Sequence, residues 1–129
     1  MGDTAFSWSS KKQPVVALST YEAEYIAASL CVCHAIWLRK LLKEIGYSQG
    51  EATKIYVDNM SAIALSKNLV CHKRSKHIDV RFHYIRDQIK GKEVQVEYVK
   101  SQDQIADIFT KPLAAEQFIK LKILLGVVD

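Results

Sequence analysis

The chain has 129 residues, 49% of them hydrophobic and 25% charged, a composition that excludes disorder over most of its length and fits a single domain. Its net charge of +4 permits a polyanionic partner without requiring one. Three cysteines without a secretory signal, and no apolar run of about 20 residues, predict an intracellular chain, cytoplasmic or nuclear, that does not enter a membrane.

The first predicted elements are a short strand and a long helix. Residues 4–10 are predicted to form the strand, and Pro14 follows in a turn because proline disfavours continued strand pairing. Ser19 and Glu22 then make a capping box, and apolar residues follow at helical spacing. Gly46 suits a C-terminal cap, so the helix is predicted to lie between these two signals.

The middle of the chain is predicted to contain a buried strand and two helices. Residues 54–58 have the pattern of a buried strand ending in a carboxylate, and a short helix is expected over 59–66. A basic loop follows over 71–77. An amphipathic helix is then predicted over 78–89, closed at Gly91.

The last third alternates as a strand and then becomes helical. Residues 93–99 alternate as a strand with its apolar side chains on one face. Ser101 and Gln104 make a second capping-box signature before a predicted helix over 105–110, and a final helix is expected over 114–125. This order of elements predicts an α/β or α+β layered fold, with both tryptophans in its core.

Helix geometry separates two glutamates at the start of the long helix. At about 100° per residue, Glu22 points about 160° away from Glu24, toward solvent. Glu24 begins a row of apolar residues that is predicted to face the sheet: Ala28, Cys31, Ala35, Leu38 and Leu42. Burying a carboxylate is costly unless it has a partner. A metal ion would supply that partner; the alternative is that Glu24 reaches water or a lysine at the helix end.

Two more acids lie at the ends of apolar elements. Asp58 ends a strand, and ligands gather at the carboxyl ends of strands in α/β sheets; the alternative is that Asp58 only caps the next helix. Asp107 lies among apolar residues of a predicted helix; the alternative is a solvated helix position. Three acids on separate elements are a common way to hold Mg²⁺.

Zinc is not expected, although several of its usual ligands occur. They are Cys31, Cys33, His34, Cys71 and His72. Cys31 and Cys33 point about 200° apart on the predicted helix, so they do not easily share one ion. A cysteine nucleophile is not expected either, and the cysteines are interpreted as small hydrophobic residues.

Several segments of the chain together match one known family in order and spacing. They are Ser7-Trp8-Ser9-Ser10-Lys11-Lys12-Gln13-Pro14, Ala17-Leu18-Ser19-Thr20, Glu22-Ala23-Glu24-Tyr25-Ile26-Ala27, Asp58-Asn59, Ser61-Ala62-Ile63-Ala64-Leu65, Lys76-His77-Ile78-Asp79 with Arg81, and Ala106-Asp107-Ile108-Phe109-Thr110-Lys111-Pro112-Leu113. They resemble the ribonuclease H region of Ty1/copia-type retrotransposon Pol polyproteins. The match spans nearly the whole chain and is specific only in combination.

The resemblance implies a fold and an activity. The fold is a ribonuclease H-like α/β domain, a mixed sheet with flanking helices, here lacking its first two strands. Residues 1–129 would be a single partial domain, with the helix over 114–125 as an optional appendage. The activity is that of an endonuclease that cleaves the RNA strand of RNA–DNA hybrids during reverse transcription, using two Mg²⁺ or Mn²⁺ ions held by four acids.

The resemblance also assigns the acids of the site by position. Glu24 would be the second acid, Asp58 the third and Asp107 the fourth, with Glu22 as second choice for the helix position. The first acid belongs to an Asp-x-Asp-Trp-like segment that does not occur here, and Asp3 does not match it. A two-ion site would then be incomplete and catalysis absent or weak. The alternative is a non-catalytic nucleic-acid-binding module or a decayed transposon-derived fragment.

The expected partners follow from the same resemblance. They are an RNA–DNA hybrid and the upstream reverse transcriptase region of the polyprotein. Phosphates of the hybrid would be contacted by Lys73, Arg74, Lys76 and His77, although a solvated basic loop is the alternative. Loss of the first strand would leave Ile55 and Val57 with unpaired backbone groups, so self-association through strand 54–58 is a further expectation.

Overall fold

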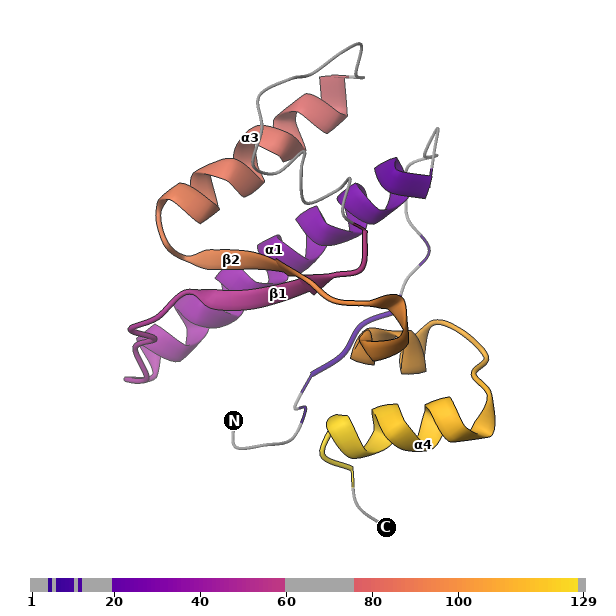
Figure 1. The fold of residues 1–129 in the computed structure, drawn as a ribbon. Coiled ribbons are helices and arrows are strands. Elements are labelled where there is room, and N and C mark those ends of the chain that lie inside the picture. The colour runs from indigo at the N-terminus through magenta and orange to yellow at the C-terminus, as the bar shows by residue number, and fades with distance from the viewer. Residues whose placement is uncertain (1–4, 6, 11, 13–19, 60–75, 128–129) are drawn as a thin grey trace.

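The computed structural model describes residues 5, 7–10, 12, 20–59 and 76–127, which form a small α/β unit (Figure 1). Its elements are the helices α1 (Thr20–Glu44), α3 (Lys76–Lys90) and α4 (Ala115–Leu124), the strands β1 (Thr53–Val57) and β2 (Val94–Tyr98), and the 3-10 turns η1 (Ser101–Asp103) and η2 (Ile105–Phe109). β1 and β2 pair in parallel, and α1 and α3 pack on them and on each other. α4 lies apart from them, against η2.

The core lies between the sheet and the helices α1 and α3. Alternation along the strands turns one face of each inward, which is the usual arrangement for a sheet covered on one side. The buried apolar residues of this core are Tyr25, Ile26, Val32, Ile36, Ile55, Val57, Ile85, Val94 and Val96. The strands and the helices α1, α3 and α4 therefore lie close to where the sequence predicts them.

The buried face of α1 is not the predicted one. Tyr25, Ser29, Val32 and Ile36 are buried, and they point about 100° away from the row that begins at Glu24. That row is only partly buried, and its Cys31 is exposed. Apolar residues surround almost the whole of α1, so periodicity alone does not select one face.

This same helix is long and apolar enough to cross a membrane by length and composition alone. The span Ala23–Glu44 has a hydropathy of 1.3, and 28% of it is buried in the structure. The expectation that no segment reaches this length and hydropathy is therefore wrong. The feature is weak evidence for a membrane span, because core helices of soluble proteins share it and α1 packs on the sheet.

Within the described residues the sheet has two strands, both parallel, rather than a mixed set. Residues 5 and 7–10, expected in a strand, have no regular structure. The Ala5 N–H donates to the Leu125 carbonyl at 3.4 Å, and the Trp8 ring stacks on Phe109 with centroids 5.7 Å apart. This segment thus runs beside η2 and α4. Trp8 and Trp37 are 68% and 57% exposed, so their predicted place in the core is wrong.

The edge of β1 away from β2 pairs with no strand in the described part of the chain, and this free edge carries different residues from those expected. Thr53 donates its N–H to the Glu93 carbonyl at 3.0 Å, and the Val57 carbonyl accepts the Val99 N–H at 3.0 Å. Because backbone groups alternate along a strand, the groups of Ile55 also face β2 and those of Tyr56 face the free edge. The prediction that Ile55 and Val57 carry the unpaired groups is therefore wrong by one residue.

A side chain already occupies part of that edge. The Gln104 amide donates to the Tyr56 carbonyl at 3.0 Å. Gln104 therefore does not act in the predicted capping box with Ser101, and no side chain caps η2. The predicted helix over 105–110 is the short 3-10 helix Ile105–Phe109.

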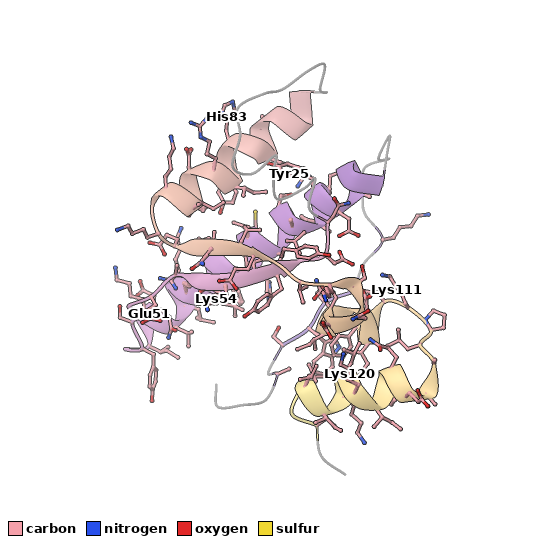
Figure 2. All side chains as sticks on the ribbon, in the orientation of Figure 1. Tyr25, Glu51, Lys54, His83, Lys111 and Lys120 are labelled. Carbon is pink, nitrogen blue, oxygen red and sulfur yellow. The ribbon has the colours of Figure 1, made fainter. Side chains whose placement is uncertain are left out.

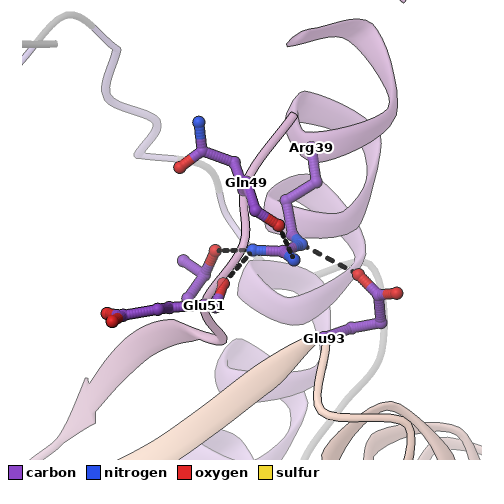
Figure 3. A network of polar contacts seen from close by, with 5 residues as sticks. Arg39, Gln49, Glu51 and Glu93 are labelled. Atoms are coloured by element: carbon purple, nitrogen blue, oxygen red, sulfur yellow. Dashed lines mark hydrogen bonds and ion pairs between the residues drawn. The ribbon is translucent and has the colours of Figure 1, made fainter. Parts of the chain in front are cut away.

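Arg39 fixes the end of the sheet where the strands begin (Figure 3). Its guanidinium donates to Oε2 of Glu93 at 2.9 Å and to Oγ1 of Thr53 at 3.0 Å. It also donates to the carbonyls of Glu51 at 2.7 Å and Gln49 at 3.2 Å. One side chain of α1 thus holds the loop before β1 and the turn before β2.

The C-terminal ends of the helices use the same backbone motif with different residues. Gly46 has a positive φ angle of 91°, as predicted for a C-terminal cap, and Gly126 after α4 has a positive φ angle of 80°. At the end of α3 the corresponding residue is Lys92, with φ 56°, and not the predicted Gly91. The Lys92 N–H donates to the Ile89 carbonyl at 3.1 Å, so the motif is complete with a residue that has a Cβ.

We therefore expect Lys92→Gly to stabilise the protein by about 0.5–1 kcal/mol, because glycine adopts this conformation without steric cost. The comparison variant is Lys40→Gly, in the exposed interior of α1, which should lose about 1 kcal/mol. Chemical denaturation of both variants measures the difference. Destabilisation by Lys92→Gly would contradict the assignment of this cap.

Candidate active site

Three of the predicted site residues come from elements that meet at one end of the sheet. Glu24 lies near the start of α1, Asp58 directly follows β1, and Asp107 belongs to η2. The parallel strands end at a common edge, and α1 runs back along them so that its first turns reach the same edge. Figure 2 shows Lys111 near this end and Glu51 at the opposite end.

The carboxyl groups of Glu24 and Asp58 lie close enough for the charge of Asp58 to act on Glu24. The charge of Asp107 also acts on Glu24. The pKa of Glu24 is raised, first because burial disfavours the charged form and then because Asp58 and Asp107 repel it; Lys111 acts in the opposite direction. A half-buried carboxyl held among like charges is typical of a functional site.

Glu24→Gln should stabilise the protein at neutral pH by about 0.5–1 kcal/mol, since it removes a charge repelled by its neighbours in a partly solvated site. The folded-state pKa of Glu24 lies above its unfolded value, so its contribution to stability is present at low pH and is lost as pH rises through the folded-state pKa. The gain should therefore vanish near pH 4.

Denaturation curves at several pH values test this. Glu51→Gln, which changes an exposed carboxylate at the far end of the sheet, should show no such gain at either pH. Equal stability of Glu24→Gln and the parent chain at pH 7 would show that the carboxyl is not repelled.

Lys111 is the member of this group that sequence reasoning missed. Its Nζ lies 3.0 Å from Oδ2 of Asp107, one helical turn earlier. The pKa of Lys111 is raised, chiefly by this hydrogen bond and further by the charges of Asp107, Asp58 and Glu24. The spacing of four residues between the acid and the lysine was the available signal. Lys111 thus offsets part of the negative charge of the three acids.

The residues at this edge fit a hard cation better than a soft one. Carboxylate oxygens are the donors that Mg²⁺ and Mn²⁺ prefer. Among the described residues, no three His, Cys, Asp or Glu side chains are arranged closely enough to enclose a metal ion. Glu24 and Asp58 face each other, whereas Asp107 is held by Lys111. Glu24 and Asp58 are therefore the primary candidate ligands, and Asp107 is paired with Lys111.

Several other predicted site residues, or their side chains, lie outside the described part of the chain. Lys73 and Arg74 lie outside the described residues, and so do the side chains of Lys76, His77 and Glu22. Cys31 and Cys33 are both free and exposed, and no metal-binding group contains them in the described part of the chain. The nucleic-acid contacts therefore stay predictions, and the choice between Glu22 and Glu24 rests on the contacts of Glu24.

Comparison with known proteins finds relatives among transposon polyproteins. The retrovirus-related Pol polyprotein from transposon TNT 1-94 of Nicotiana tabacum is 45% identical over 123 residues, 95% of this chain. That from transposon RE2 of Arabidopsis thaliana is 38% identical over 128 residues, 99% of this chain. The truncated Ty1-A Gag-Pol polyprotein of Saccharomyces cerevisiae is 29% identical over 116 residues, 84% of this chain.

In each of these relatives the match covers 9% of the polyprotein, so the chain spans about a tenth of their length. No family model matches the chain. No solved structure matches it either.

Proposed function

Since this chain is homologous over nearly its whole length to a segment of Ty1/copia-type retrotransposon Pol polyproteins, we propose that it is the ribonuclease H part of such a polyprotein. Its reaction is hydrolysis of the RNA strand in an RNA–DNA hybrid, in the cytoplasm or nucleus. The observation that supports the proposal is that Asp58 and Asp107 are near enough for their charges to act on Glu24. The resemblance assigns acids at these same positions.

Each of the three acids has a distinct part in the proposed site. Glu24 and Asp58 would hold Mg²⁺ or Mn²⁺ together, and a cation there would offset the repulsion that raises the pKa of Glu24. Asp107 would be the third ligand, and Lys111 pairs with it in the structure. Bound ions would supply an activated water and stabilise the charge that develops on the phosphodiester.

The 129 residues hold three of the four acids that the resemblance assigns. We propose that the fourth comes from the polyprotein segment preceding this one, on a strand that adds to the free edge of β1. That edge offers the backbone groups of Lys54 and Tyr56, and the incoming strand must displace the Gln104 amide from the Tyr56 carbonyl. Without that strand, the same edge can pair with another copy of the chain.

The test supplies the preceding segment of the polyprotein, either fused to the chain or as a separate peptide, and follows a labelled hybrid in Mg²⁺. Cleavage should appear with the segment, stay near background without it, and leave single-stranded RNA intact. Robust cleavage by the 129 residues alone would refute the need for the fourth acid. Hybrid binding without cleavage after restoration would favour the non-catalytic alternative, and neither binding nor cleavage would indicate a decayed fragment.

The basic residues of the segment 73–77 are proposed to contact phosphates of the hybrid. They are Lys73, Arg74, Lys76 and His77. Binding should weaken as salt rises, because each phosphate contact releases a counterion. Replacing Lys73, Arg74 and Lys76 together with alanine should reduce the slope of log Kd against log salt concentration by about 2–3. An unchanged slope, measured by titration of labelled hybrid, would mean that these residues stay solvated.

A further inference from the structure

The side of α1 that faces away from the core carries a second regular row, apolar except at His34. Its residues are spaced alternately by four and three positions, and all but the half-buried Ala23 are exposed: Ala23, Ala27, Leu30, His34, Trp37 and Leu41. This is the heptad spacing of a helix that packs along another helix. The row does not include the residues of α1 that face the core, among them Tyr25, Val32 and Ile36. α1 is therefore patterned for two packing faces, and its core residues occupy one of them.

The large residues of this row are open to solvent. Leu30, Trp37 and Leu41 are 43%, 57% and 44% exposed, and Ile45 just beyond the helix is 60% exposed. Contiguous exposed apolar rows of this kind mark interaction surfaces. The His34 ring lies beside the Trp37 indole, with ring centroids 5.8 Å apart. The indole remains exposed to solvent beside it.

The sizes of the residues along the row indicate what covers it. The first half is small, with Ala23 and Ala27, and the second half is large, with Trp37 and Leu41. Two copies of the row in antiparallel orientation place Trp37 against Ala27 of the other copy and Leu41 against Ala23. Leu30 then lies against His34 near the two-fold axis. Large residues opposite small ones fill the space between two helices, whereas a parallel pair would set Trp37 against itself.

We propose that α1 of this chain pairs with α1 of a second copy in antiparallel orientation, forming a two-fold symmetric dimer. The same surface then serves both copies, as symmetric dimers require. The inference does not depend on the acids or on the proposed nuclease activity. It is also distinct from pairing through the β1 edge, which involves Lys54 and Tyr56.

The first test is the oligomeric state of the full chain, measured by sedimentation equilibrium over a range of concentrations. A dimer is expected, and Trp37→Glu should weaken its Kd by about a hundredfold or more, since it places a charge at the centre of the interface. Val80→Glu is the matched control. Val80 is 65% exposed on α3, outside the row, so its replacement should leave the dimer intact.

The second test addresses orientation through size complementarity. Ala27→Trp should weaken the dimer, because the new indole meets Trp37 of the other copy. Combining it with Trp37→Ala exchanges the small and large positions and should restore the dimer, which a merely unfolded variant would not do. Circular dichroism checks the fold of each variant.

Three outcomes would overturn the inference. One is a monomeric parent chain throughout the concentration range. Another is a dimer that survives Trp37→Glu and is lost when Lys54 and Tyr56 are replaced by proline. The third is a failure of the double variant to recover while both single variants remain folded. Binding of the monomer to phospholipid vesicles through α1 would count with the first outcome, because lipid would then be the occupant of this face.

Discussion

Asp58→Asn should reduce hybrid cleavage by about a thousandfold or more, equivalent to about 4 kcal/mol in the barrier, in the protein supplied with its preceding segment. Asparagine keeps the shape of the side chain and loses the charge that a cation needs. Asp58 lies close enough to Glu24 for its charge to act there, and its charge also acts on Lys111, so it occupies the centre of the proposed site. Single-turnover cleavage in Mg²⁺ measures the loss.

The matched control is Asp103→Asn. Asp103 lies in η1, where Lys120 contacts it, and it takes no part in the contacts of Glu24. Its replacement should leave cleavage within about twofold, since an exposed ion pair contributes little. Asp58→Asn should also stay folded, because it removes one of the charges that repel Glu24. Full activity in a folded Asp58→Asn variant would remove Asp58 from the site and with it the proposed chemistry.

Arg39→Ala should destabilise the fold by about 2–4 kcal/mol. The Arg39 side chain is 13% exposed and makes hydrogen bonds to two side chains and two carbonyls. Its removal leaves the carbonyls of Gln49 and Glu51 without this donor and the Glu93 carboxylate without its ion pair. The expected loss is large because one residue ties three segments together (Figure 3).

Two further variants separate geometry from charge at this position. Arg39→Lys keeps the charge but offers fewer donors in a different arrangement, so it should recover less than half of the loss. Lys40→Ala removes a neighbouring exposed cation from the same helix and should change stability by less than about 0.5 kcal/mol. Urea denaturation measures the free energy of unfolding of Arg39→Ala, Arg39→Lys and Lys40→Ala. A loss below about 1 kcal/mol for Arg39→Ala would show that water replaces these hydrogen bonds readily.

The ends of the elements were predictable where the signal is local. Gly46 ends α1 and Gly126 ends α4 because glycine adopts the positive φ angle that this motif requires. At the end of α3, Lys92 adopts a positive φ angle. Lysine has no preference for this conformation, so the sequence did not predict it. The strand over 93–99 was predicted from alternation and the strand over 54–58 from its buried-strand pattern. In both, alternate residues such as Ile55 and Val96 are buried and their neighbours are not.

Features that depend on tertiary partners were not predictable. The apolar character of α1 on several sides hid which face meets the sheet, so Tyr25 and Val32 were missed as core residues. Residues near Trp8 have strand-like composition, but strand pairing needs a neighbour, and Trp8 instead stacks on Phe109. Gln104 looked like part of a helix cap and bonds to a strand about 50 residues earlier.

The candidate site was partly accessible from sequence. The rule that ligands gather where parallel strands end pointed to Asp58. Helix geometry favoured Glu24 over Glu22, although the row that begins at Glu24 is only partly buried. The meeting of Glu24 with Asp58 then depends on α1 running back along β1, which only the assembled fold provides. Arg39 was missed because its carbonyl partners have no side-chain signature.

The parallel pairing of β1 with β2 imposes an order of events during synthesis. Thr53 pairs with Val94, about 40 residues later in the chain, and at about 5–20 residues per second the ribosome needs several seconds to make that stretch. During this interval β1 has left the ribosome with its inward face, Ile55 and Val57, covered by α1 alone. Its backbone then lacks the β2 neighbour on one side, and this is when a nascent chain is most open to chaperones or to strands of neighbouring nascent chains.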